Sequence, residues 1–205
     1  MKLEGKISII TGGATGLGKA MALEFANAGA DVVVCSRNKG NIEKVRDEIM
    51  ALGRHSLAIV TDVCVKEQVA NMVKKVIDKF GRIDILVNNA GTSHNMPIPD
   101  LTEDIWDLIL DTNLKGVFLC TQAVAKHMVK QKYGKIINIT STSALGAIEP
   151  GQAAYAASKF GVVGFTKASA REFGPYGINV NAIAPGRILT NIVYAQYTRA
   201  GKAFY

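Results

Sequence analysis

The sequence predicts an α/β fold: a doubly wound, parallel sheet of six strands with helices on both faces. Short apolar runs rich in β-branched residues alternate with longer segments of helical periodicity, which is the pattern of parallel strands joined by right-handed helical crossovers. A glycine-rich turn follows the first apolar run and opens a helix. The 205 residues, 48% of them hydrophobic, contain no repeat or long polar stretch, so we expect residues 1–205 to form a single domain.

The same patterns give the individual elements. The expected strands are Lys6–Thr11, Asp31–Ser36, Ser56–Thr61, Asp84–Asn88, Lys135–Thr140 and Ile178–Ile183. The expected helices are Leu17–Ala28, Asn41–Leu52, Lys66–Phe80, Thr102–Lys130 and Ala153–Phe173. In such a sheet ligands bind in the crevice beyond the carboxyl ends of the strands, so the residues that follow each strand are the candidates for function.

Charge and hydropathy exclude several classes of protein. The net charge is +7, but the basic residues are scattered, and their densest cluster lacks the interleaved aromatics of a nucleic-acid binder; that cluster is Lys126, Lys130, Lys132 and Lys135. No segment reaches the roughly 20 apolar residues of a membrane span, and the first residues lack the apolar core of a signal peptide. We therefore expect no nucleic-acid partner, no membrane association and a cytoplasmic location.

The residues that could bind metal form no ligand pattern. The three cysteines are widely separated and lie in apolar runs, and the three histidines are isolated; they are Cys35, Cys64, Cys120, His55, His94 and His127. We predict no disulfide and no metal site.

The turn after the first strand predicts a phosphate-binding site. Gly12, Gly16 and Gly18 allow close approach of a pyrophosphate, and Thr15 and Leu17 open a helix whose N–H groups attract anions. A tight turn that binds nothing is the structural alternative.

The residues after the second strand predict the kind of dinucleotide. An enzyme that uses NAD carries an acid there for the ribose hydroxyls, but this chain has Ser36, Arg37 and Asn38. Asp31 lies at the wrong end of the strand, whereas Arg37 is placed to pair with a 2′-phosphate. NADP(H) is therefore favoured and NAD(H) is the alternative. For Arg37 itself, the structural alternative is a charged residue on an exposed turn that binds no cofactor.

Tyr155 and Lys159 form a candidate acid/base pair. They are four residues apart on an expected helix and so share a face. A phenol titrates near pH 10, too high for an efficient base at neutral pH. We expect the Lys159 charge, together with the positive charge of an oxidised nicotinamide, to lower that pKa. Two ordinary surface residues are the alternative.

Taken together, these motifs resemble those of the short-chain dehydrogenase/reductase family, which has a Rossmann fold. The resemblance spans almost the whole chain and rests on segments in the family's order: Thr11-Gly12, Gly16 and Gly18, Asn88-Asn89-Ala90-Gly91, Asn113, Ser141, Tyr155 with Lys159, and Pro185-Gly186. It implies hydride transfer between a nicotinamide and a carbonyl or alcohol.

The resemblance also implies the role of each catalytic residue. Tyr155 would protonate the carbonyl oxygen or deprotonate the alcohol, and Ser141 would hold that oxygen by a hydrogen bond. Lys159 would bind the nicotinamide ribose. Asn113 would hold a water that links Lys159 to solvent.

Further cofactor contacts are implied by position. The implied adenine contacts are Asp62 and Val63; those at the fourth strand are Asn89, Ala90 and Gly91; and those beside the nicotinamide are Pro185, Gly186, Ile188 and Thr190. Of these residues, Ile188 and Thr190 would contact the nicotinamide carboxamide and orient the ring for hydride transfer.

The chain departs from the family pattern in two places. Ser141 lies one position further from Tyr155 than is usual, which we attribute to an insertion near residues 147–150; Thr142 and Ser143 are the alternative hydroxyls. The chain also stops at Tyr205, before the family's usual substrate-covering loop and seventh strand, so we expect a domain shortened at its C-terminus. A catalytically silent cofactor-binding or interaction protein is the rival function.

Substrate and assembly are the least specified properties. The expected pocket residues are Thr92, Ser93, His94, Asn95, Met96, Ala147, Ile148 and Tyr194. They fit a sugar acid or polyol, as in the gluconate 5-dehydrogenase-like branch, or a 3-oxoacyl thioester on an acidic carrier protein. Lys132 matches a carrier-docking position of the acyl reductases, but Tyr176 stands where a second basic residue is common. The resemblance implies a homotetramer or homodimer.

Overall fold

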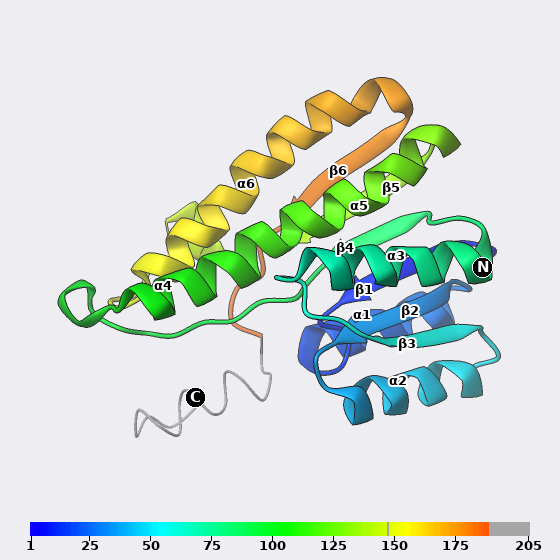
Figure 1. Ribbon diagram of the computed structural model, residues 1–205, viewed down its shortest axis with the longest axis horizontal. Coiled ribbons are helices and arrows are strands. Elements are labelled where there is room, and N and C mark those ends of the chain that lie inside the picture. Colours follow the sequence, from blue (N-terminus) through cyan, green and yellow to red (C-terminus); the bar gives the residue numbers. More distant parts are fainter. Residues whose placement is uncertain (147, 189–205) are drawn as a thin grey trace.

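The computed structural model describes residues 1–146 and 148–188. These residues form a six-stranded parallel sheet in the order β3-β2-β1-β4-β5-β6 (Figure 1). The strands are β1 (Ile7–Thr11), β2 (Asp31–Ser36), β3 (Ser56–Val60), β4 (Ile85–Asn88), β5 (Gly134–Ile139) and β6 (Ile178–Ile183). The strand order reverses between β1 and β4, and a crevice opens at such a point beyond the carboxyl ends of the strands.

Helices connect the strands on both faces of the sheet. They are α1 (Gly16–Asn27), α2 (Lys39–Ala51), α3 (Lys66–Phe80), α4 (Glu103–Leu110), α5 (Gly116–Gln131) and α6 (Ala153–Phe173). Short 3₁₀ turns lie at Ile98–Asp100, Thr142–Leu145 and Gly174–Tyr176. The doubly wound α/β fold predicted from the sequence is confirmed.

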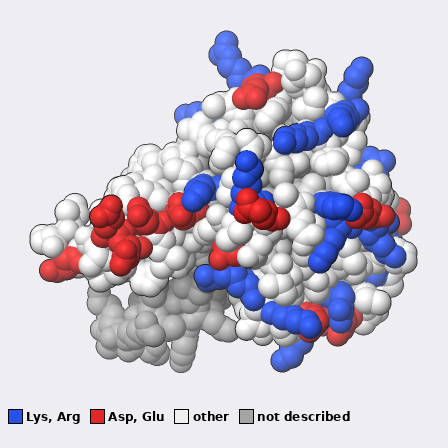
Figure 2. All heavy atoms as spheres, viewed as in Figure 1, with Lys and Arg blue, Asp and Glu red and all other residues white. Residues whose placement is uncertain are grey.

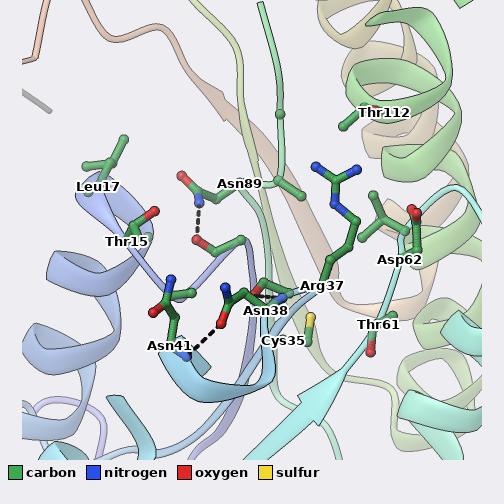
Figure 3. Close-up of a pocket in the computed structure, with 18 residues that line it drawn as sticks. Thr15, Leu17, Cys35, Arg37, Asn38, Asn41, Thr61, Asp62, Asn89 and Thr112 are labelled. Atoms are coloured by element: carbon green, nitrogen blue, oxygen red, sulfur yellow. Dashed lines mark hydrogen bonds between the residues drawn. The ribbon is translucent and has the colours of Figure 1, made fainter. Parts of the chain in front are cut away.

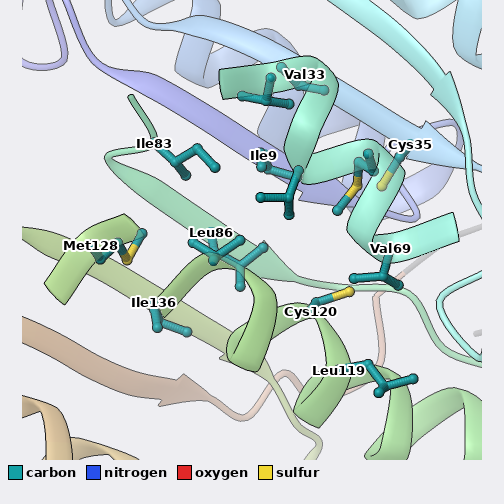
Figure 4. Packing of buried hydrophobic residues seen from close by; sticks show 14 of the residues in the cluster. Ile9, Val33, Cys35, Val69, Ile83, Leu86, Leu119, Cys120, Met128 and Ile136 are labelled. Carbon is teal, nitrogen blue, oxygen red and sulfur yellow. The ribbon is translucent and has the colours of Figure 1, made fainter. Parts of the chain in front are cut away.

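The sheet is buried between two apolar layers. One cluster joins side chains of β1, β2, β4 and β5 to α3 and α5, with the C-terminal part of α6 packed against it (Figure 4). The second cluster joins the other face of the sheet to α1 and α2. Both faces are covered over β1, β2 and β4, and these strands are largely apolar, whereas β6 alternates between buried apolar residues and exposed asparagines.

The prediction of one continuous α-helix over Thr102–Lys130 is wrong. Its middle is a π-helical turn, Asp111–Lys115, that separates α4 from α5. The wider turn carries Asn113, whose side chain bonds to the backbone of Thr92 in the segment after β4. Tertiary bonds of this kind cannot be read from helical periodicity, and π turns are frequent at functional sites.

Charged side chains are spread over the surface, with acidic groups gathered over α4 (Figure 2). Within the described residues, no helix is long and apolar enough to cross a membrane. Nor does that part of the chain contain a group of three or more His, Cys, Asp and Glu side chains that could hold a metal ion.

Candidate active site

A cleft of about 410 Å³ lies at the carboxyl ends of β1, β2, β3 and β4 (Figure 3). It is lined by every residue that the sequence predicted for these four strand ends: Gly12, Thr15, Gly16, Leu17, Gly18, Ser36, Arg37, Asn38, Asp62, Val63, Asn89, Ala90 and Gly91. Five lining residues were missed, namely Ala14, Cys35, Asn41, Thr61 and Thr112. Thr112 comes from the π turn, and no local sequence signal identifies it.

The glycine turn leaves no room for side chains. A Cβ atom on Gly18 would lie 2.2 Å from the Gly12 carbonyl oxygen and 2.5 Å from Asn89 Nδ2. Gly12 itself has φ +64°, in the left-handed region that favours glycine. Within the described residues the Thr15 side chain does not cap α1, so the first N–H groups of the helix remain available to an anion in the cleft. The turn therefore fits a pyrophosphate.

Hydrogen bonds hold the glycine turn against the end of β4. Asn89 Nδ2 donates to the carbonyl oxygens of Thr11 at 3.0 Å and Gly12 at 3.2 Å. Thr11 Oγ1 accepts from the backbone N–H groups of Asn89 at 2.9 Å and Ala90 at 3.0 Å. These bonds fix the width of the crevice between β1 and β4.

Arg37 extends from the end of β2 into the cleft, and Figure 3 shows its side chain rising beside Asp62 toward Thr112. The next residue is held in place, because Asn38 Oδ1 accepts from the N–H of Asn41 at 3.0 Å and so caps α2. Ser36 Oγ accepts from the N–H of Asn38 at 3.3 Å. Arg37 is exposed to solvent.

A second group of polar side chains meets where α6 begins beside the end of β5. Lys159 Nζ donates to the carbonyl oxygen of Ile139 at 2.9 Å and lies 5.6 Å from the centroid of the Tyr155 ring. The Ser141 hydroxyl lies near the phenol of Tyr155 and acts to lower its pKa. The residues come together because β5 ends just before Ser141, while Tyr155 and Lys159 lie on the same face of α6.

Burial changes the pKa of both partners. Lys159 is only 5% exposed, and desolvation lowers its pKa from 10.5 to about 8. Desolvation raises the pKa of Tyr155, and the nearby Ser141 hydroxyl opposes this rise without overcoming it. In the protein without cofactor, burial is the larger effect on the phenol pKa; the expectation that Lys159 and the nicotinamide charge together lower it stays a prediction.

The three neighbouring hydroxyls have different partners. Ser141 Oγ accepts from the N–H of Ser143 at 3.1 Å, which directs its own hydrogen away from the 3₁₀ turn. Ser143 donates to Gln152 Oε1 at 3.2 Å. The backbone N–H of Thr142 donates to the carbonyl oxygen of Pro185 at 3.0 Å, which brings the segment after β6 alongside Ser141.

Asn113 is completely buried and its amide is oriented by three bonds. Oδ1 accepts from the N–H of Thr92 at 2.8 Å; Nδ2 donates to the Thr92 carbonyl at 2.9 Å and to Ser158 Oγ at 3.1 Å. A Cβ atom on Gly91 would lie 3.2 Å from Asn113 Oδ1 and 3.6 Å from Lys159 Nζ, so the absence of a side chain there leaves a small space bordered by both.

Two loops form the walls on the substrate side. The N–H of Met96 donates to the Gly151 carbonyl at 2.8 Å, and Glu149 pairs with Arg187 after β6. Of the predicted substrate-side and nicotinamide-side residues, Ala147, Thr190 and Tyr194 lie outside the described part of the chain. The other predicted residues lie within the described part of the chain: Thr92, Ser93, His94, Asn95, Met96, Ile148, Pro185, Gly186 and Ile188.

A dinucleotide cleft joined to a Ser-Tyr-Lys group defines the class of protein, and comparison of the sequence agrees. The sequence model of the short chain dehydrogenase family matches residues 6–200. The chain belongs to this family and is an oxidoreductase that uses a nicotinamide dinucleotide.

Individual relatives are similar over most of their length. The (2S)-[(R)-hydroxy(phenyl)methyl]succinyl-CoA dehydrogenase subunit BbsD of Thauera aromatica is 49% identical over 93% of this chain and 76% of the relative. The 3-oxoacyl-[acyl-carrier-protein] reductase FabG of Thermotoga maritima is 44% identical over 93% of this chain and 77% of the relative. A solved short-chain type dehydrogenase/reductase from Mycobacterium marinum superposes with a TM-score of 0.92 at 40% identity, covering 97% of this chain and 80% of its own.

The buried ammonium of Lys159 predicts a pH-dependent stability. Between pH 8 and 10.5 the unfolded chain binds more protons at this residue than the folded protein does, so its contribution to the free energy of unfolding rises with pH. Relative to Lys159→Met, the wild-type protein should gain on the order of 3 kcal/mol between about pH 7 and pH 10. Urea unfolding of both proteins across this range measures the difference, and a constant difference would contradict the pKa of about 8.

Proposed function

We propose that this chain is an NADP(H)-dependent reductase of 3-oxoacyl thioesters in which Tyr155 is the proton donor. The observation that carries the proposal is the meeting of Ser141, Tyr155 and Lys159 at the edge of a cleft built for a dinucleotide. Bound nicotinamide supplies the hydride to the carbonyl carbon. The residues of the chain supply the proton and the orientation.

Each polar group of the site has a proposed role in the reduction. Because Ser141 Oγ already accepts from Ser143, its hydrogen is directed toward the substrate oxygen, which it holds beside Tyr155. The Tyr155 hydroxyl protonates that oxygen as charge develops on it. Lys159 binds the nicotinamide ribose, and its ammonium stabilises the phenolate that remains. A water in the space over Gly91, held by Asn113 Oδ1, would return a proton through Lys159.

Arg37 is the proposed determinant of NADP(H) preference. Its exposed guanidinium stands where the adenosine ribose would carry a 2′-phosphate, and a planar fork is suited to phosphate. Asp62 lines the same cleft but follows β3, and Asp31 lies at the far end of β2, so neither takes the place of the acid expected for NAD.

We expect Arg37→Asp to reverse the cofactor preference. The carboxylate should repel the 2′-phosphate and accept from the ribose hydroxyls of NAD, so kcat/KM for NADPH should fall about 10²-fold while that for NADH rises. Steady-state kinetics with both cofactors measures the ratio, with Lys39→Asp at the exposed start of α2 as the control. An unchanged preference for NADPH would refute the assignment of Arg37.

The thioester is favoured over a sugar acid or polyol by the apolar character of the substrate side. Leu145, Ile148 and Ile188 are 70%, 50% and 38% exposed around the Ser141 segment, where an acyl or aryl chain would contact them. Two relatives are named for acyl thioesters, one on a carrier protein and one on CoA. An acidic carrier remains part of the proposal, with Lys132, which precedes β5, as its proposed docking cation.

A substrate screen separates this proposal from its rivals. With NADPH at saturation, acetoacetyl-CoA should be reduced with kcat/KM at least about tenfold above that for 5-ketogluconate or simple ketones. Comparison of kcat/KM for acetoacetate linked to an acyl carrier protein with kcat/KM for acetoacetyl-CoA tests whether the carrier protein is recognised. Preference for 5-ketogluconate would favour the sugar-acid reading, and NADPH binding without turnover on any substrate would favour a catalytically silent protein.

We also propose that residues 1–205 form one domain that pairs with a second copy through α5. Both core clusters pack on one sheet, which supports a single domain. Phe118 is 41% exposed near the middle of the α4–α5 rod and stacks edge-to-face on Phe165 of α6. Asp107 and Lys130 are exposed toward opposite ends of α4–α5, so an antiparallel pairing with a second copy would bring each acid toward the partner's base.

Charge exchange tests this homodimer. Lys130→Glu should shift the equilibrium toward the monomer, and Asp107→Lys in the same chain should restore the dimer because the interaction is reciprocal. Analytical ultracentrifugation at low salt measures both, with Lys75→Glu on α3 as the control. Equal self-association of all variants would exclude α5 as the interface. A tetramer would require a second interface in addition to α5.

A further inference from the structure

A row of buried polar side chains crosses the core from α5 to α6. Asn88 at the end of β4 donates from Nδ2 to Thr121 Oγ1 at 3.1 Å and to Asn138 Oδ1 at 2.8 Å. Asn138 on β5 donates from Nδ2 to Thr166 Oγ1 at 2.9 Å. All four side chains are at most 7% exposed. We name Thr121, Asn88, Asn138 and Thr166 the core polar chain.

Thr166 sets the direction of every hydrogen bond in the core polar chain. Its hydroxyl hydrogen is donated to the Val162 carbonyl at 2.7 Å, so its oxygen accepts from Asn138. Asn138 must then present Nδ2 to Thr166 and Oδ1 to Asn88, which fixes the orientation of both amides. A buried network whose members are satisfied in one arrangement holds its elements in one relative position.

Thr166 lies on the same face of α6 as the proposed catalytic pair. Tyr155, Lys159 and Thr166 are separated by four and seven residues, which are one and two helical turns. Lys159 bonds to the carbonyl of Ile139, and Thr166 bonds to the side chain of Asn138, the preceding residue of β5. Two polar bonds, two turns apart on α6, therefore join this helix to consecutive residues of the strand that leads to Ser141.

We propose that Thr166 and Asn138 are positioning residues for the reduction: they fix the register of α6 on β5 and thereby the place of the Tyr155 hydroxyl relative to Ser141. The inference rests on the proposed role of Tyr155. The Lys159 bond fixes α6 at one point on β5, and the bond at Thr166 fixes it at a second point two turns further along the helix. Misplacement of reacting groups by about 1 Å costs as much as about 10²-fold in rate.

The test replaces the Thr166 hydroxyl by a methyl group of similar size. Thr166→Val should lower kcat for acetoacetyl-CoA about tenfold, because the proton donor is displaced, while KM and the Kd for NADPH stay within about twofold. Thr166→Ser retains the hydroxyl and should recover most of kcat. Thr166→Cys retains a weaker hydrogen-bond acceptor with little change in packing and should give an intermediate kcat. If Thr166→Val does not fold, Thr166→Cys is used in its place.

Thr121→Val provides the matched control. It removes the same kind of hydroxyl from the other end of the core polar chain, but on α5, and should lower Tm to a similar extent with kcat unchanged. If Thr166→Val and Thr121→Val lower kcat equally, or if Thr166→Ser does not recover it, the core polar chain is only structural and the inference is wrong. A wild-type protein without turnover would instead refute the proposed function itself, and with it the role of Thr166.

Discussion

The docking of α6 on β5 is the contact on which the active site depends. Lys159 is brought out of water along this helix, and its ammonium finds the Ile139 carbonyl at the end of the strand. Burial without that acceptor would cost several kcal/mol. The same contact brings Tyr155 near Ser141, so the burial of the Lys159 ammonium and the position of the proposed proton donor depend on one packing interaction.

The cofactor side and the substrate side of the candidate site lie at the same edge of the sheet, but different hydrogen bonds hold them in place. Asn89 and Thr11 close the crevice around the glycine turn, whereas Asn113 ties the π turn to Thr92 and to the α6 residue Ser158. Asn113 therefore connects the cofactor cleft with the helix that carries Tyr155. This arrangement explains why a completely buried amide stands in an otherwise apolar helical stretch.

Much of the fold could be predicted because its strands are short runs rich in β-branched residues and its helices show regular apolar periodicity. Its β-branched runs gave the bounds of β2 and β6 correctly, and helical periodicity gave those of α3 and α6. The π turn could not be predicted, since bonds between Asn113 and the distant Thr92 hold it. Likewise the glycine turn was recognisable as a local motif, but Thr112 enters the cleft only through the fold, and the raised pKa of Tyr155 depends on burial that spacing does not encode.

The central claim is that the phenol of Tyr155 delivers the proton while the rest of the chain binds and orients. The most direct measurement is kcat for acetoacetyl-CoA reduction by Tyr155→Phe at neutral pH, together with the Kd for NADPH from fluorescence titration. We predict a loss of turnover of at least about 10²-fold with an unchanged Kd. Turnover close to that of the wild-type protein would contradict the account.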